Sequence, residues 1–174
     1  NRGNSKSDLK DYYGAISDFT KAIEINPNSA NAYNNRGNSK SDLKDYYGAI
    51  SDYNKAIEIN PNSANAYNNR GNSKSDLKDY YGAISDYNKA IEINPNSANV
   101  YYNRGNSKSD LKDYYGAISD FTKAIEINPN YADAYINRGI GKYWLDDYNG
   151  ACIDARKAQE LGSDATRIIN VVCK

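Results

Sequence analysis

The pattern of apolar and polar positions predicts helices, and the clearest one lies between residues 45 and 60. Apolar residues recur there at steps of three and four, which places them along one side of a helix. They are Tyr46, Ala49, Ile50, Tyr53, Ala56 and Ile57. Asp45 is a suitable N-cap, and Pro61 stops the helix because proline cannot continue it. The polar residues of this stretch are expected to face away from the apolar side: Ser51, Asp52, Lys55 and Glu58.

A second helix is predicted just before the first, with Tyr33, Gly37, Lys40 and Leu43 on one side. Glycine inside a helix costs about 1 kcal/mol relative to alanine. Gly37 therefore indicates a close contact between helices. A turn this short, at Lys44 and the following aspartate, makes the two helices pack antiparallel.

The helix pair repeats along the whole chain with a period of 34 residues. Three series show this step: Pro27, Pro61, Pro95 and Pro129; Gly3, Gly37, Gly71, Gly105 and Gly139; Ala15, Ala49, Ala83, Ala117 and Ala151. A fixed period of this kind predicts an all-α solenoid, in which each pair buries its apolar side against its neighbours. Stacking also explains how a chain with a mean hydropathy of −0.89 can fold.

The period and several residues within it resemble the tetratricopeptide repeat family, as far as about Leu161. The residues that carry the resemblance are Tyr33, Gly37, Ala49, Tyr53, Ala56 and Pro61. The resemblance implies a right-handed superhelix of antiparallel helix pairs. Two residues depart from the family pattern, since Arg36 stands where leucine is usual and Lys40 where tyrosine is common. We expect Arg36 to pack its stem on tyrosines or to pair with an acid; a direct role in ligand binding is the alternative.

This alignment divides the chain into a partial repeat, four further repeats and a cap. The ranges are 1–29 for the partial repeat, then 30–63, 64–97, 98–131 and 132–162, and 163–174 for a capping helix. The phrase ACIDARKAQELG in the last repeat also resembles the terminal repeat of bacterial members.

Asparagines form a polar stripe on the first helix of each repeat, which in this family lines the inner, concave face. We call the following residues the asparagine ladder: Asn35, Asn38, Asn69, Asn72, Asn103, Asn106 and Asn137. An asparagine amide carries an acceptor and two donors, so it can pair with the backbone of an extended peptide. The alternative is that recently duplicated, AT-rich coding sequence favours asparagine and that the face is only solvated. The carboxylate clamp of some members is not expected, because Asn34, Asn99 and Asn103 occupy its cationic places.

The last repeat replaces part of this polar stripe with apolar residues. Together with one residue of the preceding repeat they make a candidate anchor site: Tyr102, Ile136, Ile140, Tyr143 and Trp144. Exposed apolar clusters often mark binding sites, and tyrosine and tryptophan are favoured anchors. The alternative is that the capping helix covers Tyr143 and Trp144.

The two cysteines, Cys152 and Cys173, lie in the last repeat and at the end of the capping segment. A turn near Gly162 would bring them close together, and a disulfide would then pin the cap. The alternative is a pair of reduced, buried cysteines. Two cysteines in a chain without histidine cannot form the usual four-ligand zinc site, so no metal or cofactor is expected.

Charge and composition limit the function further. The chain has 22 basic residues (Lys plus Arg) and 22 acidic ones (Asp plus Glu), so its net charge is zero. Proteins that bind nucleic acids or anionic membranes need an excess of basic residues, so we expect neither kind of partner. No apolar run approaches the roughly 20 residues that span a bilayer. The chain lacks histidine and a glycine-rich phosphate loop, and its acidic residues recur at the same positions of the repeats. We therefore expect that the chain is not an enzyme.

The predicted function is therefore that of a scaffold that binds a protein or peptide ligand, an extended peptide in the asparagine-lined concave groove. One alternative is a self-assembling array, a dimer or filament, joined through the uncapped end at Asn1. The other is a targeting domain of a larger enzyme.

Overall fold

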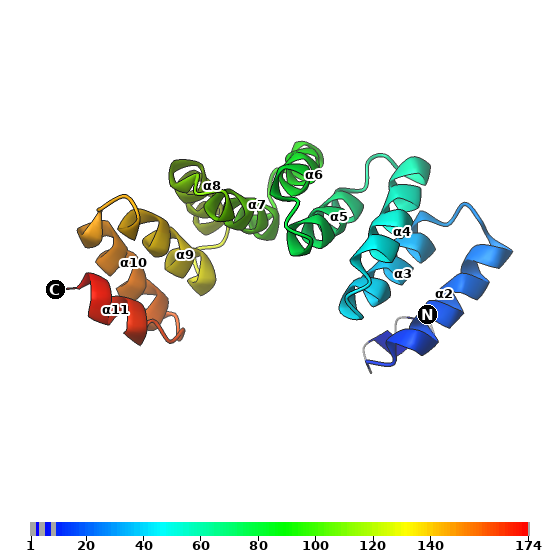
Figure 1. Ribbon diagram of the computed structural model, residues 1–174, viewed down its shortest axis with the longest axis horizontal. Helices are drawn as coiled ribbons and strands as arrows, with labels where there is room; N and C mark the ends of the chain where they lie inside the picture. Colours follow the sequence, from blue (N-terminus) through cyan, green and yellow to red (C-terminus); the bar gives the residue numbers. More distant parts are fainter. Residues whose placement is uncertain (1–2, 4–5, 8–9, 174) are drawn as a thin grey trace. The chain divides into compact units, whose positions relative to one another are not determined.

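The computed structural model describes residues 3, 6–7 and 10–173, and the regular structure within them is helical throughout. Asn1, and with it the predicted self-association surface at that end, lies outside the described residues. Figure 1 shows the helices in chain order. They are α2 (Tyr12–Ile25), α3 (Ala30–Asp42), α4 (Tyr46–Ile59), α5 (Ala64–Asp76), α6 (Tyr80–Ile93), α7 (Ala98–Asp110), α8 (Tyr114–Ile127), α9 (Ala132–Tyr143), α10 (Tyr148–Glu160) and α11 (Thr166–Val172).

The chain divides into two compact units, unit 1 with residues 1–93 and unit 2 with residues 94–174. In unit 1 each helix from α2 to α6 packs against the next, and in unit 2 the same holds from α7 to α11. The predicted all-α fold of stacked helix pairs is confirmed. None of the helices in the described part of the chain is long and apolar enough to cross a membrane.

The helix ends lie where the capping residues predict them. Asp45 is the N-cap of α4, and its carboxylate accepts a hydrogen bond of 3.0 Å from the backbone N–H of Gly48. The helix ends at Ile59, and Asn60 then accepts from the backbone N–H of Asn62 across the intervening proline. The same arrangement of cap and stop recurs in α2 and α8.

The turn between the two helices of a repeat is a left-handed C-cap. Lys44 has a φ of 63°, and the backbone N–H of Asp45 donates to the carbonyl of Lys40 over 2.9 Å. This is the hydrogen bond of a Schellman motif, in which glycine is usual at the left-handed position. Lys10, Lys78 and Lys112 repeat it, so the tight reversal is a fixed part of these pairs.

The two helices of a pair meet where glycine faces an aromatic ring. A Cβ on Gly37 would lie 2.6 Å from Cε1 of Tyr53, a residue that is only 1% exposed. This confirms that Gly37 marks a close helix contact. Most of the remaining buried core is alanine, as at Ala49 and Ala56 of α4.

Replacing Gly37 with alanine tests this contact. Overpacking costs about 1–3 kcal/mol, and the better helix propensity of alanine offsets about 1 kcal/mol of it. Gly37→Ala should therefore lower the free energy of unfolding, as measured by urea titration with circular dichroism. Gly139→Ala is the comparison variant: its Cβ would lie 3.3 Å from the backbone oxygen of Ala151, a tight contact but a milder one, so a smaller loss is expected. Equal effects of the two substitutions would contradict the contact.

Candidate functional site

A buried carboxylate joins the two helices of each repeat between residues 30 and 162. Asp52 on α4 accepts from Nε and Nη2 of Arg36 over 2.9 and 2.7 Å, and Nζ of Lys40 lies 2.8 Å from its second oxygen. The Asp52 side chain is 5% exposed, so the expectation that it faces solvent was wrong. The same cluster recurs as Arg70, Lys74 and Asp86; Arg104, Lys108 and Asp120; Arg138, Lys142 and Asp154.

The arginine of this cluster also reaches the preceding repeat. Nη1 of Arg36 donates to the hydroxyl of Thr20 over 3.1 Å, and its guanidinium lies 5.6 Å from the ring centroid of Tyr33. The hydrogen bond with Asp52 raises the pKa of Arg36. Both contacts expected for Arg36, with a tyrosine and with an acid, are therefore present, and its donors are used within the fold.

Neutralising Asp52 should be costly. Asp52→Asn leaves two cations in a largely buried site without a counter-charge, and breaking such a cluster lowers the free energy of unfolding by up to about 3–5 kcal/mol. The control is Glu58→Gln in the exposed Lys55–Glu58 pair, which should leave the free energy of unfolding nearly unchanged, because solvent screens an exposed pair. Thermal and urea unfolding measure both variants. Similar losses in the two would show that the Asp52 cluster contributes no more than a surface pair.

In unit 1 the side-chain amides of the asparagine ladder form hydrogen bonds with one another and with neighbouring asparagines. Nδ2 of Asn69 donates to Oδ1 of Asn34 over 3.2 Å and to Oδ1 of Asn38 over 3.0 Å. Asn34 and Asn38 lie on α3, so these two bonds hold α5 against α3, while Oδ1 of Asn69 accepts from Asn68 of its own helix. Asn35 accepts from Asn34 in the same way. These amides serve the packing of neighbouring repeats.

Asn38 is held in one orientation by two donors. Its Oδ1 accepts from the hydroxyl of Tyr53 over 2.9 Å as well as from Asn69. Burial raises the pKa of the Tyr53 phenol, and the charges of Asp42 and Asp52 raise it further, so this hydroxyl stays protonated and donates. Within the described residues, Nδ2 of Asn38 donates to no protein group. This exposed asparagine therefore presents its amide N–H₂ to whatever lies on this surface.

A polar hollow of about 300 Å³ lies beside this amide. We call it the polar hollow; its lining residues are Asn38, Ser41, Asp42, Tyr53, Asn69 and Asn72. Asn72 belongs to the same pattern as Asn38, because its Oδ1 accepts from the hydroxyl of Tyr87 over 2.8 Å.

The ladder in unit 2 has the same construction with one change. Nδ2 of Asn137 donates to Oδ1 of Asn106 over 2.8 Å and to the hydroxyl of Tyr102 over 3.0 Å. Phe121 stands where Tyr53 stands in unit 1, so no phenol hydroxyl reaches Asn106 from that position. Within the part of the chain that the structure describes, Nδ2 of Asn106 has no acceptor. Asn103 lies half-buried on α7.

The candidate apolar residues separate into two places. Ile140, Tyr143 and Trp144 line a hollow of about 470 Å³ beside α11. We call it the apolar hollow; α11 and the segment before it supply its other lining residues, Asp164, Arg167, Ile168, Val171 and Val172. Ile136 packs against the buried alanines of α10. Tyr102 lies elsewhere, with its ring centroid 5.8 Å from that of Phe121 and 4.8 Å from that of Tyr131.

The capping helix covers these residues only in part. Tyr143 is half-buried and packs against the C-terminal core, whereas Trp144 is 58% exposed. The lining residues on α11 could be anticipated only as an apolar stripe at Ile168, Ile169, Val171 and Val172, because the sequence does not show which way a capping helix turns.

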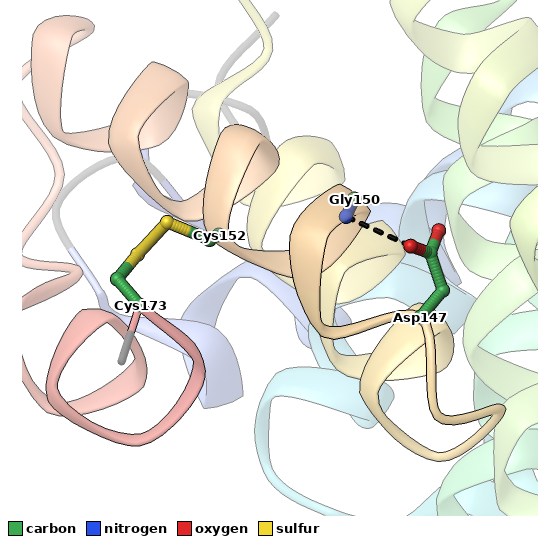
Figure 2. The surroundings of a disulfide bond; sticks show 4 residues. All are labelled: Asp147, Gly150, Cys152 and Cys173. Atoms are coloured by element: carbon green, nitrogen blue, oxygen red, sulfur yellow. Dashed lines mark hydrogen bonds between the residues drawn. A yellow bond between two sulfur atoms is a disulfide. The ribbon is translucent and has the colours of Figure 1, made fainter.

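A disulfide fastens α11 to α10. Figure 2 shows Cys152 on α10 joined to Cys173 at the end of α11. The Cα–Cα distance of this disulfide is 5.0 Å. The same view shows Asp147, the N-cap of α10, whose carboxylate accepts from Gly150. The structure thus brings the two cysteines together. In the described part of the chain no group of histidine, cysteine and acidic side chains could hold a metal ion.

Opening this disulfide should loosen the cap. The crosslink spans 21 residues, and closing a loop of about this size stabilises by roughly 3 kcal/mol. Either Cys173→Ala or reduction with dithiothreitol should speed amide exchange across α11, as measured by mass spectrometry. Exchange in α5 should stay unchanged as the internal control. Equal protection of α11 in the oxidised and reduced chain would contradict this role.

Comparison with known proteins places these repeats in a family. A family model described as tetratricopeptide repeat matches residues 30–63, 64–97 and 98–131, and one described as TPR repeat matches residues 3–44. No curated protein sequence matches the chain.

Several solved structures share the fold. A crystal structure of MamA is 25% identical, covers 92% of this chain and 94% of its own, and has a TM-score of 0.86. Two structures at 22% identity show the fold alone. One is YrrB, described as a TPR protein with an unusual peptide-binding site; the match covers 97% of this chain and 87% of that chain, with a TM-score of 0.80. The other is Pseudomonas aeruginosa pilF; the match covers 95% of this chain and 76% of that chain, with a TM-score of 0.87.

Proposed function

We propose that this chain, which belongs to the tetratricopeptide repeat family, binds an extended peptide of a partner protein along the asparagine ladder. The family and the fold make the chain a protein–protein interaction scaffold. The more specific part of the proposal concerns what the ladder offers to a ligand.

The observation that carries the proposal is the fixed orientation of Asn38. Because its oxygen is occupied by Tyr53 and Asn69, the amide N–H₂ is the group that remains for a ligand. Asn106, one of its equivalents in unit 2, also has its oxygen occupied, by Asn137. A donor that is already oriented loses little freedom when it binds. Peptide carbonyls are the acceptors that every extended segment carries, whatever its side chains.

This narrows the role of the ladder. The side-chain donors of Asn69 and Asn137 are used in hydrogen bonds to the neighbouring repeat. We therefore assign these two residues a supporting role and not a contact with the ligand. The groups proposed to touch the ligand are the amides of Asn38, beside the polar hollow, and of Asn106. The similarity in fold to YrrB, described as having a peptide-binding site, is consistent with a peptide ligand.

The test removes the donors and keeps the acceptors. In Asn38→Asp/Asn106→Asp, a carboxylate oxygen can still accept from Tyr53, Asn69 and Asn137, but the N–H₂ is gone. The probe is a peptide selected on the intact chain from a random dodecapeptide display library, with binding measured by fluorescence anisotropy. Two lost hydrogen bonds of about 1 kcal/mol each should weaken binding by about tenfold or more.

The control is Asn62→Asp/Asn130→Asp, which adds the same charge at exposed loop positions. It should leave the affinity unchanged. Equal affinities of the ladder variant and the control variant would overturn the ladder as a binding surface.

A further inference from the structure

The apolar hollow in unit 2 has the same register as the polar hollow in unit 1. Ile140, Tyr143 and Trp144 stand at the repeat positions that Asn38, Ser41 and Asp42 occupy. The opposite wall also corresponds, since α11 follows and packs against α10 as α5 follows and packs against α4. The final repeat therefore keeps the register of the site between repeats and exchanges its polar lining for an apolar one.

The tryptophan in this hollow is exposed but held in place. Trp144 ends α9 and is 58% exposed, whereas the preceding repeats carry aspartate at its position. Its ring stacks on Tyr114 with a centroid distance of 6.0 Å and an interplanar angle of 10°. Tyr143 meets it edge-on at 5.7 Å. A large ring fixed on one side and open on the other is suited to bind without being ordered first.

Across the hollow, α11 supplies aliphatic side chains. Val171 is 48% exposed, and Ile168 and Val172 complete this wall. A volume of about 470 Å³ falls in the range of ligand pockets, which is roughly 300–1,000 Å³. The disulfide at Cys173 keeps this wall against α10.

The rim of the hollow carries two charges that differ in their surroundings. Asp164 accepts a hydrogen bond of 3.1 Å from the backbone N–H of Thr166, and hydrogen bonding to Thr166 lowers the pKa of this carboxyl group. Arg167 forms no ion pair with any residue that the structure describes. The charge of Asp164 is thus stabilised locally, while the guanidinium of Arg167 is the one left for a ligand.

We propose that the apolar hollow binds an aromatic or branched aliphatic side chain of the partner peptide, next to an acidic residue that pairs with Arg167. This rests on the proposed function, because the peptide that fills the hollow is the one held by the ladder. The ladder contacts the peptide backbone and accepts many sequences, whereas the hollow selects one side chain of the bound segment.

The test uses residues that the chain itself carries at the same register. Ile140→Asn/Trp144→Asp gives the apolar hollow the two residues that stand at the equivalent positions of the polar hollow. The preceding repeats carry asparagine and aspartate at these positions. Dodecapeptides selected from the random display library on the intact wild-type chain are the probe. They should share an aromatic or branched aliphatic residue within two positions of Asp or Glu. Their affinity should fall tenfold or more for the variant, as measured by anisotropy.

Two further variants keep the result interpretable. Val171→Asp alters the opposite wall and should weaken the same peptides, with helix content checked by circular dichroism. Arg167→Gln should abolish the preference for the acidic residue and leave that for the apolar one. The matched control is Tyr115→Asp/Ile153→Asn, which removes exposed apolar side chains outside the hollow and should leave affinity unchanged.

The outcomes separate the two proposals. Selected peptides without a shared apolar residue, or with an affinity that Ile140→Asn/Trp144→Asp leaves intact, would overturn the hollow even where Asn38→Asp/Asn106→Asp weakens binding. Loss of binding in the hollow variant alone would support the hollow and remove the ladder. A library that yields no binder would count against both.

Discussion

The buried carboxylate of Asp52 meets two cations from the neighbouring helix, whose side chains are only 17% and 21% exposed. Taking charges out of water is costly unless each finds partners, and here both oxygens and most of the guanidinium donors are engaged. The arginine continues to the preceding repeat, so one cluster sets the spacing within a pair and between pairs. Since much of the core is alanine, with little shape to fix helix rotation, this polar contact specifies the register on which the ladder depends.

Helix ends and close contacts were predictable because each depends on one residue type acting locally. Asp45 caps, the proline after Asn60 stops, and Gly37 admits the ring of Tyr53. Asp52 was misplaced because helical periodicity sorts residues only by polarity. Its partner lies 16 residues away on another helix, and a buried charge looks like a surface charge until both helices are considered. The departures from the family pattern at Arg36 and Lys40 were the signal that such a pair exists.

The direction of the asparagine amides could not be predicted at all. Asn38 and Asn69 are both asparagines of the same polar stripe. Asn38 presents its N–H₂ at the surface, whereas Asn69 uses both of its side-chain donors in hydrogen bonds to the neighbouring repeat. The difference arises from the hydroxyl of Tyr53 and from the offset between adjacent first helices. In unit 1 the offset places Asn69 against Asn34 and Asn38, and in unit 2 it places Asn137 against Asn106, so part of the ladder serves packing within each unit.

The last repeat shows what happens when the same frame is kept and the lining changes. Arg138, Lys142 and Asp154 preserve the buried cluster, so Ile140 and Trp144 occupy the positions of their polar equivalents, although α9 ends one residue earlier than the first helices before it. A surface of amides holds any backbone almost equally well and cannot by itself tell one peptide from another. In the proposed complex the apolar hollow would add the missing discrimination, since a well-placed apolar side chain buries its surface there and a polar one does not. Selectivity would then depend on the repeat in which the repeating pattern is broken.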